Sequence, residues 1–536
     1  MTDFSQSAHA IINDVLKHEP IEATWAGVHD YDAEYPDVTL DGFARQQERA
    51  KTHHDTLRRW KPEQLSQSDA IDWHMLVSKF EVQLRESQEL QHHKHSPSLY
   101  PNVAIEGIYS LLARDYAPLR DRLPALASRL SKIPAIFAAA RTNLQRAPEI
   151  WREIAIEETD GGAEFLQHTV GHIVHEHGAL QPALDGAIAA CQEYGRFLRE
   201  DFANKNGMPF AIGRELFDFK LKREHLLELD ADALLAFGER AVRTTQDQLA
   251  EVARRIDKDK PWGKIIEELR GDLPDEGALL KEYRAGVEQA KQFIQDRRLV
   301  SIPPGESLEV VETPTFMRPT IPYAAYMPAG GFEKHQVGLY YVTPLNEHLS
   351  ADDRRQQMFG HNRYGMLLTN VHEGYPGHHL QLATASSVAS PVRKLLWNTV
   401  FCEGWALYCE QLVLDEGLTA DPRHRIFQLK DQLWRACRVV IDVKLHTAQM
   451  TFDEAVDMLV NVAHLERPNA IGEVRRYTQS ATQPMSYLMG KHQILNLRQR
   501  EQQRLGGRFN LQSFHDRLLS YGTIPVALIE PAFAAS

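Results

Sequence analysis

Apolar side chains recur at helical spacing along most of the chain. In residues 8–17 they stand one, three and four positions apart on one helix face, at Ile11, Ile12, Val15 and Leu16. Similar amphipathic segments occupy residues 69–91, 119–145, 230–257 and 277–298. We therefore predict a helical N-terminal region over residues 1–300.

The pattern changes near residue 300, where prolines become frequent and apolar residues gather in short runs. β-prone runs stand at residues 308–311, 323–327 and 338–343, among prolines at 314, 319, 322 and 328. We expect a small irregular β-sheet of two to four strands within about residues 305–345. Helical spacing resumes at residue 354 and continues to about residue 500. The predicted fold is mostly α, a large multi-helix fold with one small sheet, in which residues 301–536 are intertwined with the N-terminal region.

The bulk composition narrows the class of protein. Of the 536 residues, 43% are hydrophobic and 25% are charged, which is typical of a folded globular protein. The net charge of -13 argues against a nucleic-acid partner, because such proteins usually carry a basic surplus. Runs of about 18 apolar residues are absent, so we expect no membrane span. The first residues lack an export signal and only four cysteines occur, so we expect a cytoplasmic location; the oligomeric state is not indicated.

The strongest chemical signal is the segment 372–379, which reads His-Glu-Gly-Tyr-Pro-Gly-His-His. In the common zinc motif His-Glu-x-x-His, two histidines four residues apart face one way on a helix, and the glutamate activates water. Here Pro376 occupies the place of the second histidine. A straight helix would separate His372 from His379 by a rise of about 10 Å. That rise is too long for two ligands that each lie about 2 Å from one zinc ion.

The four residues between the histidines offer a way to shorten this gap. Proline interrupts helical hydrogen bonding, and the two glycines permit the backbone angles of a bulge. A bulged turn would bring His378 to the place of the usual second ligand. We therefore favour His372 and His378 as ligands, with His379 as the alternative to His378.

A third ligand is expected from Glu403, which lies 25 residues after His378 in an apolar helical run over residues 395–414. A carboxylate on a second helix would complete a His-His-Glu zinc site with one position open for water. Glu410, two turns beyond Glu403, is a candidate acceptor for an imidazole N–H. A His-Glu pair also arises by chance, and a helical glutamate is usually a solvated charge. The apolar helices and the extra histidines favour the metal site over that alternative.

These motifs make the chain similar to a known family. Residues 372–381 and 403–408 resemble the bacterial family named domain of unknown function 885. Further segments that fit it are 323–342, 435–438, 441–446, 473–477 and 486–491. The family looks like a distant branch of the zinc peptidases that use two histidines and a glutamate. The resemblance implies a largely helical body around a deep cleft and one Zn²⁺ per chain.

The expected activity is hydrolysis of a peptide or small amide by a zinc metallopeptidase. In this hypothesis Glu373 is the general base, which takes a proton from the attacking water and passes it to the leaving amine. Tyr487 is the first candidate for stabilising the oxyanion, and Tyr477 is a weaker candidate for substrate contact. Arg476 and Lys491 are candidates for binding a substrate carboxylate, although structural salt bridges would explain them equally well.

The sequence leaves two other functions open. One is a zinc hydrolase of a non-peptide amide or ester, with the same ligands. The other is a non-catalytic scaffold that retains the fold, which Glu373 disfavours because a scaffold needs no general base. For a peptidase, either the β-prone run 323–327 or the run 338–342 is a candidate edge strand that would pair with an extended peptide.

Overall fold

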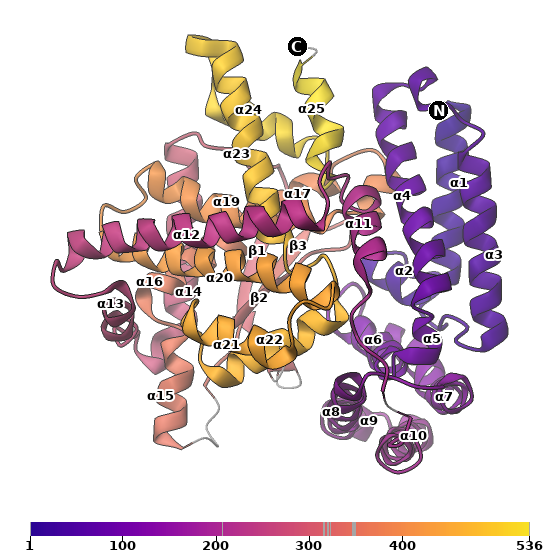
Figure 1. The fold of residues 1–536 in the computed structure, drawn as a ribbon. Coiled ribbons are helices and arrows are strands. Elements are labelled where there is room, and N and C mark those ends of the chain that lie inside the picture. The colour runs from indigo at the N-terminus through magenta and orange to yellow at the C-terminus, as the bar shows by residue number, and fades with distance from the viewer. Residues whose placement is uncertain are drawn as a thin grey trace. The chain divides into compact units, whose positions relative to one another are not determined.

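Figure 1 draws the computed structural model of the protein as a ribbon. Contacts between residues divide the chain into two units. The structure describes residues 2–205, 207–314, 317–318, 321, 323–345 and 350–534. Unit 1 comprises residues 1–210, 330–334 and 390–395, and unit 2 comprises residues 211–329, 335–389 and 396–536. No helix in these described ranges combines the length and apolarity that a membrane crossing requires.

Unit 1 is built from helices that begin at side-chain caps where the sequence supplies them. Thr2, Thr39 and Ser66 each accept a hydrogen bond from a backbone N–H in the first turn of a helix. Its helices are α1 (Asp3–His18), α2 (Pro20–Ala26), α3 (Leu40–Leu57), α4 (Gln67–Glu89), α5 (His92–His95), α6 (Leu99–Leu112), α7 (Leu119–Asn143), α8 (Glu149–Phe165), α9 (Gly171–Glu176), α10 (Gln181–Arg199) and α18 (Pro391–Leu395). The amphipathic segments at 8–17, 69–91 and 119–145 are therefore confirmed as helices.

Unit 2 contains the remaining helices and the sheet. Its helices are α11 (Arg214–Arg223), α12 (Ala231–Ile256), α13 (Trp262–Leu269), α14 (Leu279–Asp296), α15 (Ala351–Phe359), α16 (Arg363–Glu373), α17 (His378–Ser386), α19 (Thr399–Asp415), α20 (Pro422–His446), α21 (Phe452–Asn461), α22 (Arg467–Gln479), α23 (Ser486–Leu505), α24 (Leu511–Leu519) and α25 (Val526–Ala534). The mostly helical fold with one small sheet is thus confirmed. The cleft that the family resemblance implies stays a prediction.

Helices α12 and α20 lie along each other (Figure 1) and approach closely where a glycine permits it. A Cβ on Gly238 would lie 2.8 Å from Cγ1 of Val439. A buried core joins the two helices to α11, α19 and α23, with Leu234, Leu407 and Val443 among its members. These contacts place residues 211–300 in unit 2, whereas the sequence pattern grouped them with the N-terminal region. Amphipathic spacing shows that a helix has a buried face, but not which element covers it.

The sheet has three strands in the order β1-β3-β2: β1 (Ser307–Glu312), β2 (Ala324–Met327) and β3 (Val337–Val342). β1 runs parallel to β3, with Val310 opposite Tyr340, and β2 runs antiparallel to β3, with Tyr326 opposite Tyr340. The hydroxyl of Tyr340 donates to Oδ1 of Asn370 at 3.1 Å, which holds the sheet against α16. Of the two runs considered for an edge strand, 338–342 is excluded because β3 is central. β2 is an edge strand.

Candidate metal centre

The helix that carries His372 ends directly after the first half of the motif. α16 stops at Glu373, the Tyr375–Pro376 peptide bond is cis, and α17 starts at His378. The backbone N–H of Gly377 donates to the carbonyl of Val371 at 3.0 Å, which folds the connection back along α16. A Cβ on Gly377 would lie 2.0 Å from the carbonyl oxygen of His372, so only glycine fits there. The expected interruption of the helix is therefore present.

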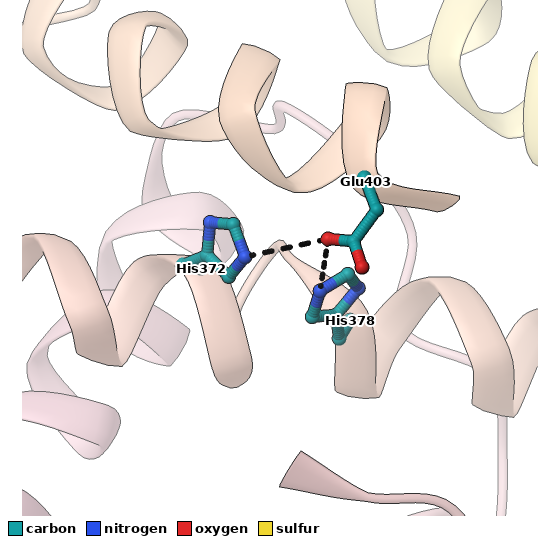
Figure 2. Close-up of side chains that lie close together, drawn as sticks. All are labelled: His372, His378 and Glu403. Atoms are coloured by element: carbon teal, nitrogen blue, oxygen red, sulfur yellow. Dashed lines mark ion pairs between the residues drawn. The ribbon is translucent and has the colours of Figure 1, made fainter. Parts of the chain in front are cut away.

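This interruption brings His372 and His378 to the carboxylate of Glu403. Figure 2 shows the two imidazoles, from the end of α16 and the start of α17, turned toward Glu403 on α19. Oε2 of Glu403 lies 3.9 Å from Nε2 of His372 and 3.4 Å from Nε2 of His378. One ligand atom from each of the three residues lies within 4.8 Å of the others. The structure thus groups His378 with the other two expected ligands.

His379 points to a different partner. Its Nε2 lies 2.5 Å from Oε2 of Glu306, and the hydroxyl of Tyr326 lies 3.2 Å from its Nδ1. The same Glu306 oxygen accepts from the hydroxyl of Tyr375 at 2.7 Å, and Lys291 pairs with its other oxygen at 3.1 Å. Burial raises the pKa of Glu306, but His379, Tyr375 and Lys291 outweigh it and lower that pKa to about 2. This buried network anchors both sides of the turn, and no sequence motif marks Glu306 as a member of it.

The charges of the cluster form an ion pair. Burial raises the pKa of Glu403, but His378 and His372 outweigh it and lower the value to about 2. Burial lowers the pKa of His378, but Cys402 and Glu403 outweigh it and raise the value well above the ordinary one. No donor among the described residues reaches Oε2 of Glu403 with hydrogen-bond geometry. A cation would fit this carboxylate by displacing the imidazole proton, as metal binding generally does.

Glu410, the candidate acceptor for an imidazole N–H, lies against the first histidine. Its Oε1 accepts from Nδ1 of His372 at 2.8 Å, and both side chains are at most 10% exposed. Because a carboxylate only accepts, Nδ1 carries the proton and Nε2 keeps its lone pair for a metal.

The candidate general base is held by the sheet. Oε2 of Glu373 accepts from the backbone N–H of Tyr326 at 3.0 Å. Because β2 is an edge strand, this N–H is not needed for pairing with β3. One oxygen of Glu373 is thereby fixed beside His372.

Tyr487 lies beside the cluster because two helices meet backbone to backbone. A Cβ on Gly490 would lie 1.8 Å from the carbonyl oxygen of Val400, and a Cβ on Gly404 would lie 2.4 Å from the backbone of Gly490. This contact of α19 with α23 places the Tyr487 ring 6.5 Å from the His372 ring, centroid to centroid, at 20° between planes. Burial raises the pKa of Tyr487, and Glu403 adds to this effect.

The three candidates for substrate contact are bound to protein groups. The Tyr477 hydroxyl donates to Glu473 at 2.5 Å, and Nη2 of Arg476 donates to the same oxygen at 3.0 Å. Nζ of Lys491 donates to Gln432 at 2.5 Å, and burial lowers the pKa of Lys491 to about 8. Tyr477 and Lys491 are buried. These contacts favour a structural role, and substrate binding by the three residues stays a prediction.

The fold and this cluster define a mostly helical protein with a buried His-His-Glu triad. The chain belongs to the family described as bacterial protein of unknown function (DUF885), which matches residues 20–532. It is similar to the solved structure of a candidate lipoprotein of unknown function from Shewanella oneidensis, at 25% identity, with 100% of both chains covered and a TM-score of 0.84. A candidate lipoprotein from Colwellia psychrerythraea shares the fold, at 17% identity, with 99% of this chain and 98% of that chain covered and a TM-score of 0.82. No curated protein matches.

Proposed function

We propose that this protein is a zinc-dependent hydrolase, and specifically a metallopeptidase. The observation that carries the proposal is the convergence of His372, His378 and Glu403, whose ligand atoms lie within 4.8 Å of one another. Two imidazoles and one carboxylate are the protein donors of a well-known type of catalytic zinc site that keeps a position open for water. The orientation of His372 by Glu410 supports the same reading, since ligand histidines usually donate their other N–H to a carboxylate or carbonyl. The resemblance to His-His-Glu zinc peptidases is part of this proposal.

Each neighbouring side chain has a defined task in the proposed reaction. Bound zinc supplies Lewis-acid chemistry, which polarises a substrate carbonyl and lowers the pKa of water. Glu373 takes the proton from the attacking water and delivers it to the leaving amine. The Tyr487 hydroxyl donates to the oxygen on which negative charge develops.

The sheet supports a peptide as substrate. β2 is the edge strand from which Tyr326 holds Glu373. An extended peptide that pairs with such an edge presents its backbone amides in a regular row. Because Glu373 occupies the N–H of Tyr326, a peptide would pair with the neighbouring open groups of β2, which would bring one of its backbone amides toward the general base. A small ester has no such row of groups to pair.

We also propose a cytoplasmic location. The four cysteines are buried and free, which agrees with a reducing compartment. The lipoprotein descriptions concern the two similar proteins. Fractionation of the native host followed by immunoblotting tests the location, and recovery with the membrane or periplasmic fraction would contradict it.

Metal analysis of the purified protein is the first test of the proposed site. We expect about one zinc per chain, lost in His372→Ala, His378→Ala and Glu403→Ala. The matched control is His335→Ala, because His335 is exposed and lies outside the cluster. Full zinc retention in the ligand variants would refute the site.

Glu373→Gln tests catalysis apart from metal binding. The variant keeps the shape of the side chain and loses the base, so zinc should remain while cleavage falls by about 10²–10⁴-fold. Glu309→Gln on β1 is the control, since Glu309 is exposed. The measurement is digestion of a peptide library followed by mass spectrometry. Cleavage of esters alone would support the non-peptide hydrolase, and a zinc-free, inactive wild type would support the scaffold.

A further inference from the structure

We propose that Trp434, Arg435 and Arg438 form a subsite that binds a carboxylate group of the substrate beside the metal cluster. The proposal rests on the proposed function, because it names a chemical feature of the substrate of that same site. The three residues lie within about one turn of α20. They are donors without acceptor capacity, so the group they recognise is an acceptor.

These side chains hold N–H groups that the described part of the protein leaves without acceptors. They are Nε1 of Trp434, Nε and Nη1 of Arg435, and Nη1 of Arg438. Buried polar groups are paired in most proteins, and an unpaired buried donor costs free energy. Four such donors on one turn of a helix therefore indicate a binding site for a ligand that accepts hydrogen bonds.

The donors gather around Tyr487, the residue that links them to the metal cluster. The guanidinium carbons of Arg435 and Arg438 each lie 4.2 Å from the centre of the Trp434 ring. They lie 5.6 Å and 4.8 Å from the centre of the Tyr487 ring, which in turn stacks at 6.5 Å on the ring of His372. Both arginines are thus held face-on to aromatic rings, which leaves their N–H edges to form hydrogen bonds.

The protein carboxylates near the two arginines leave Nε and Nη1 of Arg435 and Nη1 of Arg438 without an acceptor. Glu473 already accepts from Nη2 of Arg438, from Arg476 and from the Tyr477 hydroxyl. Nε of Arg438 donates to that same hydroxyl at 2.7 Å. Asp431 lies 3.9 Å from Nη1 of Arg435, which is too far for a hydrogen bond. Arg438 is therefore fixed on two sides, and its Nη1 remains for a ligand together with Arg435.

A carboxylate is the ligand that suits this arrangement. Planar guanidinium groups bind carboxylates through paired N–H groups, and such charge-assisted bonds are stronger than neutral ones. Arg435 keeps 14% of its side chain exposed, and Trp434 and Tyr487 are partly exposed, so the group is not sealed in the core. The carboxylate belongs either to the C-terminus of a peptide or to an acidic side chain.

Arg435 is the residue to change. Its Nε and Nη1 have no hydrogen-bond partner among the described residues, and its ion pair with Asp431 is long at 3.9 Å, so its replacement removes subsite donors without breaking a hydrogen-bond network. Arg438 is unsuitable because it also holds Glu473 and Tyr477. The control is Arg423→Gln on the same helix, whose side chain is 46% exposed and pairs with Asp421. Arg435→Lys is a second variant that keeps the charge but loses the planar fork.

The experiment measures peptide binding by calorimetry to zinc-loaded Glu373→Gln protein, so that no cleavage occurs. The probes are N-acetyl-Ala-Ala-Ala with a free carboxylate, its C-terminal amide, and the amide of N-acetyl-Ala-Ala-Glu. We expect at least one carboxylate-bearing peptide to bind about tenfold or more tightly than the neutral amide. Adding Arg435→Gln should reduce this preference to below about threefold, Arg435→Lys should reduce it partly, and Arg423→Gln should leave it unchanged.

The outcomes separate the subsite from the hydrolase. A preference for the first probe identifies a C-terminal carboxylate, and a preference for the third identifies an acidic side chain. Equal binding of all three probes, absence of binding, or a preference that survives Arg435→Gln overturns the subsite. Wild-type protein that holds zinc and cleaves peptides without any such preference overturns the subsite alone. Zinc-free protein that still prefers the carboxylate supports the subsite and removes the hydrolase.

Discussion

The hydrogen bond from His372 to Glu410 allows a quantitative test of the metal site. Its two atoms are 2.8 Å apart, and the two side chains are 10% and 4% exposed, so solvent screens the interaction little. Loss of such an outer partner typically weakens metal affinity by about 10–100-fold, or about 1.4–2.7 kcal/mol. Glu410→Gln keeps an oxygen acceptor and loses the charge, so we expect about tenfold weaker zinc binding. Glu410→Leu also leaves the imidazole N–H unpaired, so we expect zinc binding to weaken about hundredfold.

The assay is competition for zinc between the protein and a chromophoric chelator of known affinity. The control is Asp415→Asn on the same helix. The Asp415 side chain is 43% exposed and forms an ion pair with Arg425. The control should bind zinc as the wild type does. If both Glu410 variants stay within about twofold of the wild type, Glu410 does not orient a metal ligand and the reasoning fails.

Two stability predictions follow from the same region. Gly490→Ala should lower the free energy of unfolding by about 3 kcal/mol, because the new Cβ would lie 1.8 Å from the carbonyl oxygen of Val400. The control is Gly472→Ala in α22, where a Cβ would meet open space, so this variant should be neutral or stabilising. Denaturant titration measures both variants. Burial raises the pKa of Asp442 to about 7, although N–H groups of Thr482 and Met485 oppose this. The folded state therefore holds a proton that the unfolded state releases above about pH 4, and the free energy of unfolding falls as pH rises toward 7, by on the order of 3 kcal/mol between pH 5 and 8. Asp442→Asn should remove that part of the pH dependence, and an unchanged slope would contradict it.

Local sequence was sufficient for the helices because their limits are set locally. The segment predicted over residues 230–257 is α12 (Ala231–Ile256), whose start is fixed by the side chain of Asp230 accepting from Ala233 N–H. The order of the strands in the sheet could not be predicted from local sequence. β3 is central because β1 and β2 pair with it from either side, and neither contact follows from the residues of β3 itself.

The parts of the site that follow from a steric rule could be predicted from the sequence. The parts that depend on residues far away in the chain could not. Pro376 excludes a continuous helix, so the interruption between His372 and His378 follows from the sequence. Glu306 carries no comparable signal, since it lies in a proline-rich turn 73 residues before its partner His379. Arg435 and Arg438 matched the family pattern, but their unpaired N–H groups depend on how α20 packs against α23.

Backbone proximity, more than helix periodicity, determines the geometry of this cluster. In the usual zinc motif one straight helix sets the spacing of both histidines. Here Gly377 precedes His378 and Gly404 follows Glu403, and at each position a Cβ would collide with a neighbouring backbone at 2.0 and 2.4 Å. Gly490 makes the third such contact, three residues after Tyr487. His378, Glu403 and Tyr487 therefore each lie within three residues of a point where two backbone segments touch, and we expect the rigid packing at those points to hold their side chains in place. Replacing any of these three glycines with alanine should thus disturb the geometry of the cluster, although all three ligand side chains are still present.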